Sequence, residues 1–104
     1  MARAQDIEHF ADEVTHRAAV GDWPQEQRAA AVETLVLALS DDWVCQDPDV
    51  EDAVCSALEA VGVMRRVGNL LFEILPDREL AECDVEAVRR CRVWLPRRYQ
   101  GRWC

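Results

Sequence analysis

The densest group of chemically active residues in this sequence is a run of acids near its middle. Segment 40–52, SDDWVCQDPDVED, holds six carboxylates in thirteen residues and no basic residue. Such a run can bind Ca²⁺, attract a basic protein or form the acidic start of a helix. A calcium-binding EF-hand loop needs glycine at its sixth position and glutamate at its twelfth. This segment has no glycine and contains the rigid Pro48, so calcium binding is disfavoured.

The second half of this segment has the pattern of a helix N-terminus. Asp47 is a suitable N-cap and Pro48 suits the first turn, where further carboxylates interact favourably with the helix dipole. This leaves Asp41 and Asp42 unexplained. Because dense carboxylates attract arginine and lysine, we predict a contact surface for a basic protein. Trp43 is either an aromatic anchor of this surface or a core residue. The predicted contact set is Asp41, Asp42, Trp43, Asp47, Asp49, Glu51 and Asp52.

A second group with metal-ligand chemistry lies near the N-terminus. His9, Glu13 and His16 share one helical face, and residues 13–16 form an E-x-x-H step. Di-iron bundles use this step on two helices, whereas it occurs once here. The group also lies opposite the apolar stripe that begins at Ile7, so it should face water. We therefore expect no metal site and no cofactor.

Segment 57–71 resembles a helix-turn-helix, with Gly62 in the turn. The motif departs from its usual pattern, because Gly68 stands where an aliphatic residue is usual and Leu58 where alanine is usual. An acidic body would also be repelled by the phosphates of DNA. A small DNA-binding regulator is therefore the alternative function, and its reading helix would carry Arg65, Arg66 and Asn69.

No pattern in the chain indicates catalysis. The five cysteines are odd in number and include no C-x-x-C pair, which favours reduced, mostly buried thiols over zinc ligands or a disulfide framework. There is no G-x-S-x-G, no glycine-rich phosphate loop and no H-E-x-x-H. We expect a protein that is not an enzyme.

The elements that must position these residues are predicted to be helices. Apolar residues recur at three- and four-residue steps over about 4–20, 23–39, 48–61, 67–75 and 84–95. No segment alternates with a period of two, although 61–67 is compatible with a short extended stretch. At 104 residues the chain is long enough for one core. We predict one all-α domain, residues 1–104, built as a compact bundle of about five short helices.

Charge divides the chain into an acidic body and a basic tail. Residues 1–86 carry a net charge of −14 and residues 87–104 carry +6. The tail, about 89–104, interleaves arginine with aromatic residues, a composition that suits binding to single-stranded nucleic acid. Folding back onto the tethered acidic body is favoured instead. In this folded-back arrangement of the tail, Trp94 would be buried, and Arg97 and Arg98 would pair with helix carboxylates.

In size and charge the chain is similar to the small acidic inhibitors that phages and mobile elements encode, including anti-CRISPR proteins and DNA mimics. This likeness implies a stoichiometric inhibitor that occupies a basic, nucleic-acid-binding surface of a partner protein, without a cofactor. We expect no direct binding to nucleic acid. The sequence has no apolar run of membrane-spanning length and no secretory signal, so a cytoplasmic location is expected.

Overall fold

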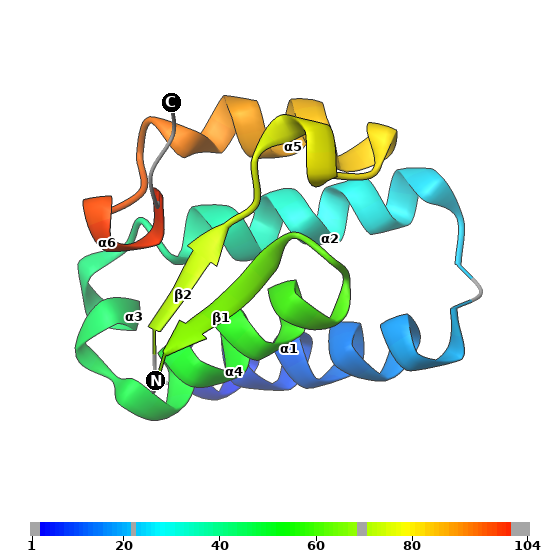
Figure 1. The fold of residues 1–104 in the computed structure, drawn as a ribbon. Helices are drawn as coiled ribbons and strands as arrows, with labels where there is room; N and C mark the ends of the chain where they lie inside the picture. Colours follow the sequence, from blue (N-terminus) through cyan, green and yellow to red (C-terminus); the bar gives the residue numbers. More distant parts are fainter. Residues whose placement is uncertain (1–2, 22, 69–70, 101–104) are drawn as a thin grey trace.

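The computed structural model describes residues 3–21, 23–68 and 71–100, and it is mostly helical (Figure 1). A two-stranded hairpin lies among the helices. In chain order the elements are α1 (Arg3–Val20), α2 (Gln25–Ala38), α3 (Asp42–Gln46), α4 (Pro48–Ala60), β1 (Met64–Gly68), β2 (Leu71–Ile74), the 3₁₀ turn η1 (Asp77–Glu79), α5 (Glu82–Arg92) and α6 (Arg97–Gln100).

The core is formed where the helices pack in pairs. Helix α1 packs mainly on α4, α2 packs mainly on α5, and the hairpin contacts α4 through β1 and α6 through β2 (Figure 1). Fully buried side chains from three helices meet at the centre, and each stabilises the fold by roughly 1.5–3 kcal/mol through burial. They include Val32, Leu35, Val36, Val54, Leu58 and Val88.

Four of the predicted helices are confirmed, as α1, α2, α4 and α5. The expected start of α4 is confirmed in detail, because Asp47 Oδ1 accepts hydrogen bonds from the backbone N–H groups of Asp49 at 3.1 Å and Val50 at 3.4 Å. Pro48 is the first helical residue. Gly62, at φ +83°, takes the left-handed conformation that ends the helix and turns the chain into β1.

The helix predicted over 67–75 is wrong, and the fold is therefore not strictly all-α. Strands β1 and β2 pair antiparallel, with Met64 opposite Ile74 and Arg66 opposite Phe72. Phe72 and Ile74 are buried while Glu73 between them is half-buried, which is the two-residue alternation of a strand. The extended stretch considered over 61–67 is the better description of this region.

The hairpin also removes the helix-turn-helix. A strand, not a reading helix, follows Gly62. Arg65 is engaged within the hairpin, where its guanidinium Nη2 lies 2.8 Å from Glu73 Oε1. Asn69 lies outside the described residues. Within the described residues, the position expected for the reading helix is therefore occupied by β1.

The described part of the basic tail packs on the body. Leu95 and Tyr99 are buried, and Arg98 pairs with Glu51 of α4. The predicted burial of Trp94 is wrong, because this residue is 66% exposed. Residues 101–104, which include Cys104, lie outside the description. No helix of the described residues has both the length and the apolarity needed to cross a membrane.

Candidate functional site

The acidic contact set lies on α3, α4 and the residues that precede them, at the end of the molecule where α1 also begins (Figure 1). Asp41 is exposed and its side chain makes no capping hydrogen bond to α3. Asp49 and Asp52 are exposed on α4, and their spacing of three residues places them on one face of that helix. Glu59, seven residues after Asp52, continues this exposed face.

Two members of the predicted set are used inside the protein. Asp47 caps α4 as described above. Glu51 Oε2 accepts a hydrogen bond from the Arg98 guanidinium, and its side chain is only 25% exposed. Trp43 is half-buried and packs against the core, so it is at most partly available to a partner. The side chain of Asp42 lies outside what the structure describes.

Exposed acids on α1 extend this surface. Asp6, Glu8 and Asp12 are exposed, and within the described residues none of them forms an ion pair. Helix α1 packs on α4, and the two helices begin at the same end of the molecule (Figure 1). The sequence prediction missed these acids. The available signal was a first helix with four carboxylates between residues 6 and 13 and no arginine among them.

We define the acidic surface as Asp6, Glu8, Asp12, Asp41, Asp49 and Asp52. The acids of the C-terminal half behave differently, because arginines pair with most of them. Arg89 Nε donates to Asp77 Oδ2 at 2.7 Å and Arg92 Nη2 donates to Asp77 Oδ1 at 2.9 Å. The hydrogen bond from Arg89 is the main reason why the pKa of Asp77 is lowered from its ordinary 3.8. The unpaired negative charge therefore concentrates on α1, α3 and α4.

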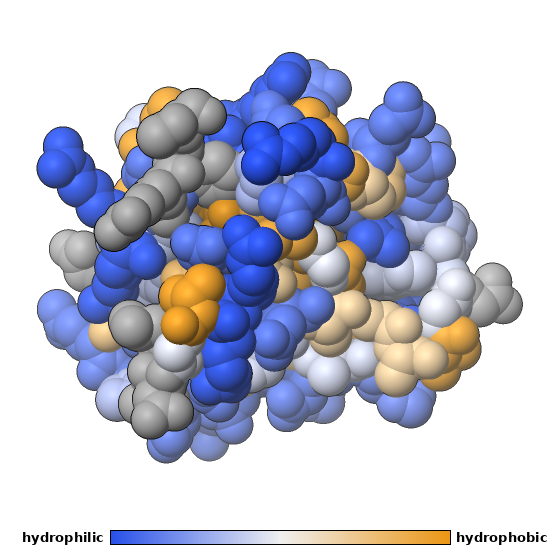
Figure 2. Space-filling model, viewed as in Figure 1, coloured by the Kyte–Doolittle hydropathy of each residue, from blue (hydrophilic) through white to orange (hydrophobic). Residues whose placement is uncertain are grey.

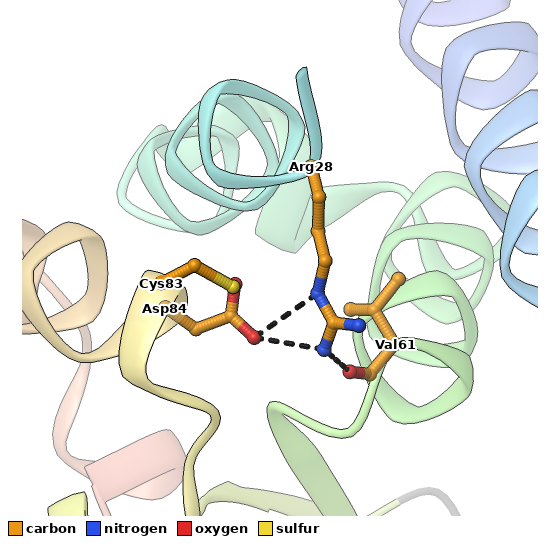
Figure 3. Close-up of polar contacts among 4 residues, drawn as sticks. All are labelled: Arg28, Val61, Cys83 and Asp84. Atoms are coloured by element: carbon orange, nitrogen blue, oxygen red, sulfur yellow. Dashed lines mark hydrogen bonds and ion pairs between the residues drawn. The ribbon is translucent and has the colours of Figure 1, made fainter. Parts of the chain in front are cut away.

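The deepest polar contact is a buried ion pair that joins three helices (Figure 3). Asp84 of α5 is completely buried, and its Oδ2 accepts hydrogen bonds from Arg28 of α2, at 2.8 Å from Nη2 and 3.3 Å from Nε. The same Nη2 donates to the carbonyl oxygen of Val61, at the end of α4. Cys83 Sγ donates to Asp84 Oδ1 at 3.4 Å. Each group in this cluster has a partner, which favours a structural role.

Three of the five cysteine thiols are poorly suited to nucleophilic chemistry. Burial, with the nearby Glu51 and Asp52 carboxylates, raises the pKa of Cys55 to about 12. Burial, together with the adjacent Asp84 carboxylate, raises the pKa of Cys83 above its usual value. Burial raises the pKa of Cys91 as well. These three thiols stay protonated at neutral pH, and a protonated thiol is a weak nucleophile.

The His9, Glu13 and His16 group lies on the exposed side of α1, as its spacing predicts. His9 Nε2 lies 3.8 Å from Glu13 Oε1. Across the described residues, no three histidine, cysteine, aspartate or glutamate side chains form a group that could hold a metal ion.

No known protein family, no curated protein and no solved structure matches this chain. Its function must therefore be inferred from its own surface.

Proposed function

We propose that this protein is a non-catalytic acidic binding protein that inhibits or regulates a nucleic-acid-handling protein by occupying its basic surface. The observation that carries the proposal is the set of exposed carboxylates on α1, on α4 and at Asp41, just before α3, that form no ion pair within the described residues. Ordinary solubility is served by interspersed charges of both signs. Here one sign is concentrated on one group of packed helices.

Electrostatics give this surface a particular kind of partner. A groove that binds nucleic acid is lined by arginine and lysine, because phosphate contacts supply most of the affinity. Carboxylates held on packed helices can take the positions of phosphates in such a groove. The same field speeds the encounter with the partner and repels free nucleic acid. This is the mode of action of a DNA-mimic or anti-CRISPR inhibitor, in a cytoplasmic setting where such partners work.

The proposal also explains which acids are left unpaired. An ion pair with an arginine of the same chain would neutralise a carboxylate and weaken its attraction for the basic residues of a partner. Glu51 is cancelled in this way by Arg98. Asp41, Asp49 and Asp52 are exposed and form no ion pair within the described residues, so they are the central contacts of the proposed interface.

The test is capture of partners from a lysate of the source cell with two charge-matched variants. In the first variant, Asp41, Asp49 and Asp52 are all changed to asparagine. In the second, Glu26, Glu82 and Glu86 are all changed to glutamine; these exposed acids lie on α2 and α5. Both variants lose three negative charges, so a difference between them reports position and not net charge.

The expected result is a nucleic-acid-handling protein captured by the wild type and the second variant and lost by the first. Adding DNA or RNA should compete for the captured protein. Equal capture by both variants would sink the proposed contact surface. Capture of nucleic acid alone, without a protein, would overturn the proposed mode of action.

A further inference from the structure

A groove runs between α1 and α2. Its volume is about 700 Å³. Its lining includes the partly buried aromatic side chains of Phe10 in α1 and Trp23 in the connecting turn, together with the buried Val14 of α1. The groove exists because α1 packs mainly on α4 and α2 mainly on α5, so the two helices contact each other little.

The wall contributed by α2 combines small apolar and uncharged polar side chains, namely Gln27, Ala30, Ala31 and Thr34. Between Ala29 and Ala38 only Glu33 and Thr34 are polar. Here Ala30 and Thr34 line the groove and are exposed, and Leu37, three residues further on, is 41% exposed. The small Ala30 and Ala31 side chains allow another helix to approach closely.

The wall contributed by α1 is acidic. Asp12 and Glu13 line the groove, and a shallower hollow that shares His9 and Asp12 with it carries the acids along α1 to Asp6 and Glu8. Among the described lining residues the arginine is Arg17, and its guanidinium contacts neutral groups of the protein. Arg17 Nη1 donates to Gln27 Oε1 at 2.9 Å, and its guanidinium lies 5.6 Å from the centre of the Trp23 ring.

The surface near the end of α1 is apolar as well. On the face that Figure 2 shows, hydrophilic residues dominate, but hydrophobic colours gather where α1 ends and the chain turns toward α2. Val20, at the end of α1, is 64% exposed. An apolar region thus lies at one end of α1 and exposed acids lie toward the other.

We propose that the groove between α1 and α2 binds a basic amphipathic helix of the partner protein. Its apolar residues would fill the space between Phe10, Trp23 and Ala31, while its arginine or lysine residues would pair with Asp12, Glu13 and the acids beyond them. This is the helix-in-groove mode of recognition. From Gln5 to Arg17 the acidic wall is about 18 Å long, which matches roughly three turns of helix. The inference rests on the proposed function, because it specifies a segment of that basic partner.

The experiment uses fluorescein-labelled synthetic helices and the intact protein. The probe is a peptide of about 15 residues with leucine on one helical face and arginine on the other. One control peptide has the same composition in an order that scatters the leucines, and a second replaces arginine by glutamate. Fluorescence anisotropy gives the dissociation constants at roughly physiological salt.

Two groove variants and one matched control test the site. Ala30→Arg and Thr34→Arg place a bulky cation in the α2 wall of the groove, whereas Ala19→Arg adds the same charge at an exposed α1 position that is not among the lining residues. We expect the groove variants to weaken binding of the basic amphipathic peptide by about tenfold or more, as for loss of a central contact. Ala19→Arg should change it by less than about twofold. Circular dichroism checks that each variant is folded.

Three outcomes would overturn the inference: no preference for the amphipathic over the scattered peptide, equal binding of the glutamate peptide, or equal effects of Ala30→Arg and Ala19→Arg. The test is separable from that of the proposed function. Replacing Asp41, Asp49 and Asp52 by asparagine should abolish partner capture and leave peptide binding nearly intact. Partner capture that depends on these acids, without peptide binding to the groove, would remove the groove inference alone.

Discussion

The two halves of the chain use their acids in opposite ways. Residues 1–64 have a net charge of −11 and residues 65–104 have a net charge of +3. In the C-terminal half, arginines hold Glu73, Asp77 and Glu79 in ion pairs, and Arg90 and Arg98 reach back to Glu33 and Glu51. The acidic surface on α1, α3 and α4 has no such partners among the described residues. Paired acids contact arginine within the fold, whereas the acids of this surface are exposed to solvent.

We expect the largest loss of stability when the buried ion pair between Arg28 and Asp84 is broken. Changing Asp84 to alanine leaves the Arg28 guanidinium, which is only 29% exposed, without its carboxylate. We expect a loss of about 3 kcal/mol in the free energy of unfolding, measured by urea denaturation, because an unpaired buried charge is strongly destabilising. Glu82→Ala, at an exposed position in the first turn of the same helix, is the control and should cost less than about 0.5 kcal/mol.

A double variant sharpens this prediction. Replacing both partners, as Arg28→Met with Asp84→Leu, removes the two charges together and should recover part of the lost stability. If Asp84→Ala lowered the free energy of unfolding by no more than Glu82→Ala, the buried ion pair would not contribute to the stability of the fold. The cluster with Cys83 would then need another explanation.

The next prediction compares the capping residue Asp47 with its exposed neighbour Asp49. Asp47→Ala removes the acceptor for the N–H groups of Asp49 and Val50 and should destabilise the protein by about 1 kcal/mol. Asp49→Asn changes an exposed acid that forms no ion pair within the described residues and should shift stability by less than about 0.5 kcal/mol. Equal costs for the two variants in urea unfolding would contradict the division of the acidic run into structural and available members.

The sequence predicted the long elements and missed the short ones. Helices α1, α2 and α4 have enough turns for their apolar spacing to be clear, and Asp47 with Pro48 marks one start. The apolar residues between Val67 and Leu75 fit both helical and strand spacing, which periodicity alone cannot resolve in a short run. Helices α3 and α6 have five and four residues, so they show no periodicity.

Much of the candidate site depends on contacts between distant parts of the chain. Arg28 pairs with Asp84 over 56 residues and Arg98 pairs with Glu51 over 47, and no local pattern specifies either pair. The acids of segment 40–52 were visible in the sequence. Which of them remain unpaired was not, because this depends on where the arginines of the C-terminal half pack. The groove likewise cannot be predicted locally, because it forms where α1 packs on α4 and α2 packs on α5.

The smallest predicted effect tests whether paired acids stabilise the fold in a pH-dependent way. The pKa of Asp77 is lowered in the folded protein, chiefly by the hydrogen bond from Arg89. Its contribution to stability is therefore fully present above its unfolded pKa, near 3.8, and is lost as the pH falls through the folded value. Asp77→Asn should cost less than about 1 kcal/mol at pH 6, since the pair is partly exposed. The difference in urea midpoint between wild type and Asp77→Asn should shrink as the pH is lowered below 3.8. A difference that stays constant with pH would place the effect of Asp77 in packing and not in its charge.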